Sequence, residues 1–232
     1  MTYKLENFFA TGLPAATVAY NGFPEYNFVG GHNSEKNIPI KELVKSAESV
    51  LSKEGKNLAL YGHNSGPQGN LALREFLVSY LDEHTGMKID TGNILLTSGS
   101  LQALDLVNKL FLKKGDTVLV EEATYGGAIS RIESLGVKHI GIKLDNEGIC
   151  PQHLIQILEM LKAKDISPKY LYTIPTVQNP TATVMPEKRR REILEIAKKY
   201  NFLIFEDDCY ADLTWDRKRP KSIYSLCDED RV

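Results

Sequence analysis

Two short polar segments each follow an apolar run, and together they offer three groups that suit one kind of ligand. Residues 175–181 read PTVQNPT and residues 205–210 read FEDDCY. Polar side chains that follow parallel strands lie where open α/β sheets bind ligands. Asn179 supplies an amide, Asp207 a carboxylate and Tyr210 a phenol. A pyridine ring that carries a phenolic oxygen would use all three groups.

Asp207 is the side chain whose chemistry is most specific. A carboxylate beside a pyridine nitrogen favours the protonated ring, because opposite charges stabilise each other. A protonated ring accepts electrons from a carbanion. Asp208 competes for this role, but the spacing to Tyr210 favours Asp207 and leaves Asp208 as a loop or cap residue. The alternative interpretation is a solvated acidic strand end.

Two further motifs could hold other parts of such a ligand. Residues 97–104 (TSGSLQAL) turn a predicted strand into a helix, and the N–H groups of a helix start bind anions. Ser100 would also serve as a simple helix cap. Tyr125 follows the next predicted strand, where its flat ring could stack on a ligand or only pack at a helix start.

The elements that must position these residues alternate regularly. Apolar runs predict strands, and apolar residues at helical spacing predict helices between them. This order predicts an α/β fold with a mostly parallel sheet and helices on both faces. The predicted strands span residues 94–97, 117–121, 138–144, 170–174 and 201–205, and the predicted helices 40–52, 67–83, 100–112, 125–135, 151–162 and 186–200.

From about Gly30 to Val232 the order of these motifs resembles the aminotransferase class I/II family, which has fold type I and uses pyridoxal 5′-phosphate (PLP). The resemblance implies an α/β large domain. It implies that Asp207 contacts the ring nitrogen and that Tyr210 and Asn179 contact the phenolic oxygen. Family members usually have Ala or Pro where this chain has Cys209. The resemblance also implies phosphate contacts from Ser100, Leu101 and Gln102, and ring stacking by Tyr125.

The resemblance has implications for the rest of the chain. Tyr61 would reach the PLP phosphate of a neighbouring subunit, which implies a homodimer. Gly31 and Asn179 would lie near the substrate, and a cis bond before Pro180 is predicted. Residues 1–60 would form an N-terminal arm and helix belonging to a small domain, and residues 61–232 the PLP-binding large domain.

The reaction implied is ping-pong transamination between an L-amino acid and a 2-oxo acid. In the family a lysine in a Ser-x-x-Lys segment of the next strand holds PLP, and we expect that strand beyond Val232. The large domain is therefore expected to be incomplete before its last strands, and residues 1–232 are expected to be inactive and unstable alone. No catalytic residue is assigned within them.

Other functions fit the same residues. The cofactor-binding positions would also serve a β-lyase, a decarboxylase or a synthase. A non-enzymatic alternative is the aminotransferase-like sensor domain of a transcription regulator. Another is an inactive fragment or binding subunit.

Composition narrows the class of protein. The 232 residues carry a formal charge of −2, which does not indicate a nucleic-acid partner. No apolar run indicates a membrane span, and no Cys/His cluster indicates a metal site. The three cysteines suit reduced thiols in a cytoplasmic protein. The basic run at residues 188–191 (KRRR) is predicted to be a solvated helix face.

Overall fold

The structure, a computed structural model, describes residues 4–9, 13, 22, 25–26, 31–60, 62 and 65–232. The chain divides into two compact units, Met1–Ala59 and Leu60–Val232. The helix α1 (Ile40–Glu54) dominates the described part of the first unit. Three short 3₁₀ helices accompany it: η1 (Leu5–Phe8), η2 (Glu35–Asn37) and η3 (Gly55–Ala59).

The second unit is built on a parallel sheet of four strands in the order β2-β1-β5-β6. Val120 of β1 lies beside Tyr172 of β5, and Thr173 of β5 beside Glu206 of β6. The predicted α/β fold with a parallel sheet is therefore confirmed. The strands are β1 (Thr117–Glu121), β2 (Lys138–Ile142), β5 (Tyr170–Thr173) and β6 (Leu203–Glu206).

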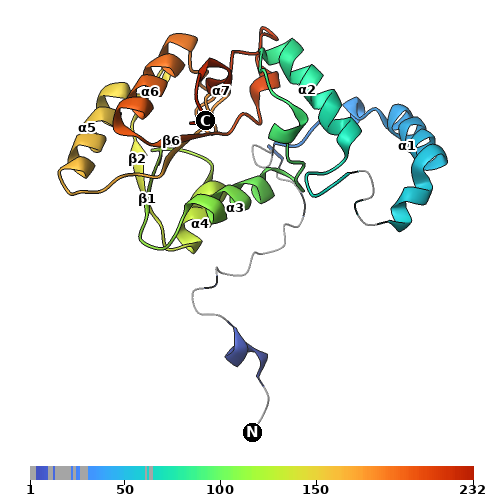
Figure 1. The fold of residues 1–232 in the computed structure, drawn as a ribbon, viewed down its shortest axis with the longest axis horizontal. Helices are drawn as coiled ribbons and strands as arrows, with labels where there is room; N and C mark the ends of the chain where they lie inside the picture. The colour runs from blue at the N-terminus through green and yellow to red at the C-terminus, as the bar shows by residue number, and fades with distance from the viewer. Residues whose placement is uncertain are drawn as a thin grey trace. The chain divides into compact units, whose positions relative to one another are not determined.

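Helices cover both faces of this sheet, with α3 and α4 on one side and α5 and α6 on the other (Figure 1). Alternate residues of β1 enter different cores, as the pleat of a strand requires. Val118 and Val120 pack with α3 and α4, whereas Leu119 packs with α5 and α6. The helices are α3 (Ser100–Phe111), α4 (Gly126–Ser134), α5 (Pro151–Lys162) and α6 (Glu187–Tyr200).

The other elements of this unit connect or flank the layers. The helix α2 begins after Asn70, whose side chain accepts a hydrogen bond from the Leu73 N–H. The remaining elements are α2 (Leu71–Thr85), η4 (Thr91–Asn93), the hairpin of β3 (Leu144–Asp145) and β4 (Gly148–Ile149), η5 (Ala211–Leu213) and α7 (Ile223–Leu226).

Three strand predictions were wrong, one wholly and two in part. Residues 94–97 form no strand: the Leu96 N–H donates to the Gln68 carbonyl, and among the described residues no sheet partner extends this pairing. Residues 138–144 do not form one strand, because β2 ends at Ile142 and Leu144 pairs with Ile149 instead. Strand β6 begins late because Asn201, at φ +55°, ends α6 in the left-handed region.

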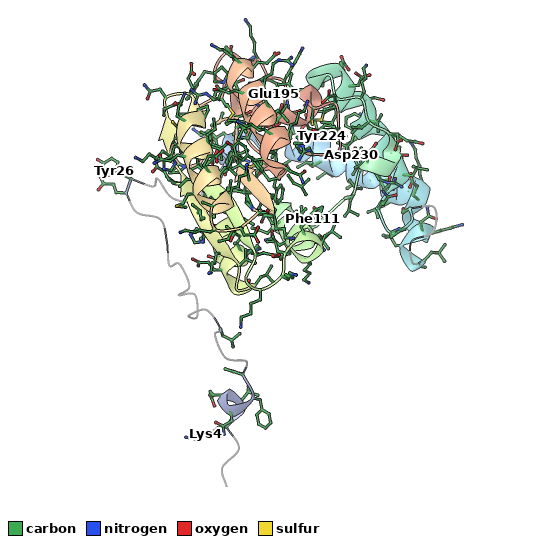
Figure 2. The ribbon with its side chains drawn as sticks, turned by 60° about the vertical axis from the view of Figure 1, so that its left-hand side comes forward. Lys4, Tyr26, Phe111, Glu195, Tyr224 and Asp230 are labelled. Atoms are coloured by element: carbon green, nitrogen blue, oxygen red, sulfur yellow. The ribbon has the colours of Figure 1, made fainter. Side chains whose placement is uncertain are left out.

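The C-terminal residues run along the outer edge of β6. The Ile204 N–H donates to the Arg231 carbonyl at 2.8 Å. Beside this contact is a largely apolar cavity of about 240 Å³, and Figure 2 labels two of its lining residues, Phe111 of α3 and Asp230. Within the described ranges, no helix is both long enough and apolar enough to span a membrane.

Candidate active site

The carboxyl ends of three neighbouring strands bring the predicted site residues to one edge of the sheet. Tyr125 follows β1, Asn179 follows β5, and Asp207 and Tyr210 follow β6. The Asn179 side chain lies close enough to the Tyr210 hydroxyl to oppose the rise in its pKa. Burial raises the pKa of Tyr210, and Asp207 and Tyr125 lie near enough to contribute. An amide, a carboxylate and two phenols therefore gather at one place.

Asp207 is held by a buried phenol. The Tyr172 hydroxyl donates to Asp207 Oδ2 at 2.6 Å. The thiol of Cys209 lies near the same carboxylate. Burial of that thiol, together with the negative charge of Asp207, raises the pKa of Cys209 to about 12. The thiol therefore stays protonated at neutral pH.

The neighbouring acid has a different partner. Asp208 Oδ2 accepts a hydrogen bond from Arg219 Nη2 at 3.0 Å, and Arg219 also binds Asp212 at 2.8 Å. Burial raises the pKa of Asp208, and the charge of Arg219 opposes that rise. The structure thus separates the two acids: Asp208 forms an ion pair, whereas Asp207 accepts from the neutral Tyr172 hydroxyl.

The loop that carries Asn179 is anchored from β1 by a buried carboxylate. Glu121, which is 1% exposed, accepts from the Thr173 hydroxyl at 2.6 Å and from the Ile174 N–H at 3.1 Å. Its other oxygen accepts from Gln178 Nε2 at 2.8 Å. Burial raises the pKa of Glu121, and these hydrogen bonds oppose the rise. Gln178 immediately precedes Asn179, so this anchor fixes the position of the amide.

A buried arginine anchors the same loop from α6. Arg190 is fully buried and donates to the Pro175 carbonyl at 3.1 Å, to Thr176 Oγ1 at 2.8 Å and to the Met185 carbonyl at 2.9 Å. It also pairs with Glu206 at 3.5 Å. The prediction of a solvated basic face at residues 188–191 was therefore wrong for Arg190. Its guanidinium satisfies carbonyl groups that the loop leaves inside the protein.

The backbone of this loop needs such support. Val177 has φ +52°, a region that β-branched residues rarely adopt. The Asn179–Pro180 peptide bond is cis, as predicted. The anchors on both sides hold Val177 in its left-handed backbone conformation.

The turn before α3 has the geometry of an anion site. Gly99, at φ +83°, precedes the helix, and the Ser98 N–H donates to Gln102 Oε1 at 2.6 Å. The first N–H groups of a helix have no acceptor within it, so those at Ser100 and Leu101 suit a phosphate. Leu101 packs against the same apolar cluster as Tyr125 and Tyr210. The residues present fit PLP: the N–H groups at Ser100 and Leu101 would bind its phosphate, and the side chains at the strand ends would contact its ring.

Tyr125 lies close over the start of α4. A Cβ atom placed on Gly127 would come within 2.5 Å of the tyrosine ring. The glycine therefore leaves room for the ring to lie close to the helix backbone. This is the position from which an aromatic side chain could cover one face of a bound ring.

Two predicted positions are not brought to this site by the described structure. Tyr61 lies outside the described residues. Gly31, at φ +54°, belongs to the unit Met1–Ala59 and is exposed. Arg74 of α2 holds the segment before that helix by donating to the Gly69 carbonyl at 3.2 Å and to the Thr91 carbonyl at 2.7 Å.

Sequence reasoning missed the side chains that support the site. These are Glu121, Tyr172, Gln178 and Arg190. A signal existed for Glu121, because a charged residue that closes an otherwise apolar strand needs a buried partner. In the described part of the chain, no group of three or more His, Cys, Asp or Glu side chains could hold a metal ion.

Comparison with known proteins agrees with this geometry. Residues 27–231 match the family described as aminotransferase class I and II. The chain is 34% identical to aromatic-amino-acid aminotransferase 1 of Thermococcus litoralis, over 89% of this chain and 49% of that protein. It is 32% identical to the uncharacterized HTH-type transcriptional regulator YdfD of Bacillus subtilis, over 84% of this chain and 41% of the regulator.

A solved structure extends the agreement to three dimensions. The kynurenine aminotransferase of Pyrococcus horikoshii, in complex with PMP, superposes with a TM-score of 0.80 at 36% identity. The match covers 88% of this chain and 49% of the other. The chain thus spans about half the length of these relatives or less. The family match over residues 27–231 agrees with the motif order, the parallel sheet and the side chains at its edge. The chain therefore belongs to the class I and II aminotransferase family, whose cofactor is PLP.

Proposed function

We propose that the protein carrying this chain transfers an amino group between an L-amino acid and a 2-oxo acid, and that residues 61–232 supply most of its PLP site. The observation that supports this most strongly is the group of Tyr125, Asn179, Asp207 and Tyr210 at adjacent strand ends. Such a set pairs with both the ring nitrogen and the phenolic oxygen of one pyridine ring.

Each side chain has a distinct task in this proposal. Bound PLP supplies an electron sink for negative charge that develops at the α-carbon of the substrate. Asp207 holds a proton on the ring nitrogen, because its carboxylate favours the positive ring. Asn179 and Tyr210 donate to the phenolic oxygen. Tyr125 covers one ring face and excludes water, and the helix start at Ser100–Gln102 binds the phosphate.

The substrate and the assembly follow from the same proposal. Gly31 and Asn179 would border the substrate, and Tyr61 would contact the phosphate of a second subunit in a cytoplasmic homodimer. Residues 1–60 would belong to a small domain. Lys169 precedes β5 and Lys198 lies in the last turn of α6, so both lie at the sheet end opposite to the site. No lysine of residues 1–232 stands in a Ser-x-x-Lys segment at a strand end, so we expect these residues alone to show no transaminase turnover.

The decisive experiment is the half-reaction. The natural protein is loaded with PLP and mixed with a panel of L-amino acids, and PMP and the 2-oxo acid are measured together. Transamination predicts one 2-oxo acid for each PMP formed. Release of ammonia or carbon dioxide without PMP would instead indicate a lyase or decarboxylase. Asp207→Asn should abolish the reaction, whereas Asp208→Asn, which disturbs the ion pair with Arg219, should reduce it far less.

The similarity to YdfD supports a second candidate, a PLP-binding sensor domain of a transcription regulator. Such a domain would bind PLP through the same residues. It would bind an amino acid without accumulating PMP and a 2-oxo acid. A PLP absorbance change with no 2-oxo acid product would favour this candidate over the enzyme.

A further inference from the structure

Strand β5 carries two buried tyrosines whose hydroxyl groups donate to different partners. Tyr170 and Tyr172 are 1% and 0% exposed. Each ring packs edge-on against Phe205, with centroids at 5.9 Å and 5.6 Å. The Tyr170 hydroxyl donates to Asn108 at 2.6 Å, and the Tyr172 hydroxyl donates to Asp207 at 2.6 Å. Both rings are therefore held rigidly, but only one points at the site.

The contact between Tyr172 and Asp207 has the length of a charge-assisted hydrogen bond, for which 2.5–2.7 Å is typical. Burial, with a further contribution from the charge of Asp207, holds the pKa of Tyr172 well above its usual range. The phenol therefore stays protonated at neutral pH and can donate to the carboxylate. A donor to a carboxylate stabilises its ionised form.

The geometry has a second consequence for Asp207. Tyr172 donates to Oδ2, which restricts the rotation of the carboxylate and leaves Oδ1 as the oxygen that can face the ring nitrogen. A ring nitrogen opposite Oδ1 could share its proton with the carboxylate or keep it. The hydrogen bond from Tyr172 favours the form in which Asp207 is negative and the ring nitrogen is positive.

We propose that Tyr172 is a positioning residue that orients Asp207 and keeps it ionised, and so holds the proton on the cofactor ring nitrogen. The inference rests on the role given to Asp207 under Proposed function. In this proposal a residue of strand β5, rather than a residue of the loops that line the site, influences whether the ring nitrogen is protonated.

The test compares Tyr172→Phe with Tyr170→Phe in the natural protein. Each variant removes one buried hydroxyl from the same strand, so Tyr170→Phe controls for loss of stability. The probes are PLP carrying an isotope-labelled ring nitrogen, whose NMR shift reports protonation, and PLP itself in a binding titration. We expect Tyr172→Phe to lower the pH at which the ring nitrogen loses its proton and to weaken PLP binding about tenfold. Tyr170→Phe should leave both readouts unchanged.

Equal readouts for Tyr172→Phe and wild type would overturn the inference. A variant with meta-fluorotyrosine at position 172 covers the case in which Tyr172→Phe fails to fold, because it keeps the ring and strengthens the donor. It should raise the pH at which the ring nitrogen deprotonates, and no change would again overturn the inference.

Asp207→Asn separates the two proposals. If it shifts the nitrogen signal while Tyr172→Phe does not, only the role of Tyr172 fails. If Asp207→Asn has no effect on the signal, the assignment of Asp207 fails, and the inference about Tyr172 fails with it.

Discussion

Replacing Arg190 with methionine tests whether this buried side chain of α6 anchors the loop that carries Asn179. The guanidinium is fully buried and donates three hydrogen bonds of 2.8–3.1 Å, to the Met185 carbonyl, the Pro175 carbonyl and Thr176 Oγ1. Methionine matches most of the side-chain length but donates none of these bonds. Two carbonyl groups would then lie inside the protein without this donor.

The expected loss follows from these contacts. A hydrogen bond from a charged donor contributes about 1.5–3 kcal/mol, and removing one partner of a buried ion pair costs about 3–5 kcal/mol. Because the three bonds share one group and their contributions do not add, we expect a loss of about 4 kcal/mol. This is a large part of the roughly 5–15 kcal/mol by which most domains are stable.

The assay is urea denaturation of the natural protein, with Arg191→Met as the matched control. Arg191 is the next residue of α6, is 55% exposed and pairs with Glu187 on the surface. Surface pairs contribute about 0–1 kcal/mol, so the control should change little. PLP affinity should fall in Arg190→Met, because the loop bearing Asn179 loses its anchor.

The ion pair with Glu206 can be separated from the carbonyl contacts. At 3.5 Å it is the longest contact of Arg190, so a double-mutant cycle with Glu206→Gln should give a coupling of about 1–2 kcal/mol. If Arg190→Met costs no more than Arg191→Met, the reasoning about the anchored loop is refuted.

Three further predictions follow from buried groups. Burial raises the pKa of Glu206 from 4.5 to about 7, so between these pH values the folded protein holds a proton there that the unfolded chain has lost. The free energy of unfolding should therefore fall by up to about 3 kcal/mol as the pH rises from about 4.5 to 7. Glu206→Gln should flatten the profile of unfolding free energy against pH. Glu121→Ala removes the acceptor of Thr173, Ile174 and Gln178 and should cost about 3 kcal/mol in the same denaturation assay, whereas exposed Glu122→Ala should cost under about 1 kcal/mol. Gly127→Ala should displace the Tyr125 ring and weaken PLP binding without loss of fold, and an unchanged dissociation constant would contradict the stacking role.

Local patterns were enough to predict the architecture of the second unit. Apolar runs such as residues 117–121 have the right length for buried strands, and Pro151 marks the start of a helix. Short local segments therefore predict the alternation of strands and helices. The motif order likewise placed Asn179 and Asp207 at strand ends. These inferences needed only neighbours in the chain.

The support of the site depends on contacts between residues far apart in sequence. Glu121 and Gln178 are 57 residues apart, and Tyr172 and Asp207 are 35 apart. Arg190 was misjudged because Lys188 and Arg191 beside it are exposed, whereas the loop carbonyls around Arg190 come together only in the folded chain. Residues 94–97 were misjudged for a related reason: a strand forms only where a partner offers its hydrogen bonds, and an apolar run cannot specify that partner. Sequence therefore determined which groups reach the edge of the sheet, and tertiary packing decided which buried groups hold them there.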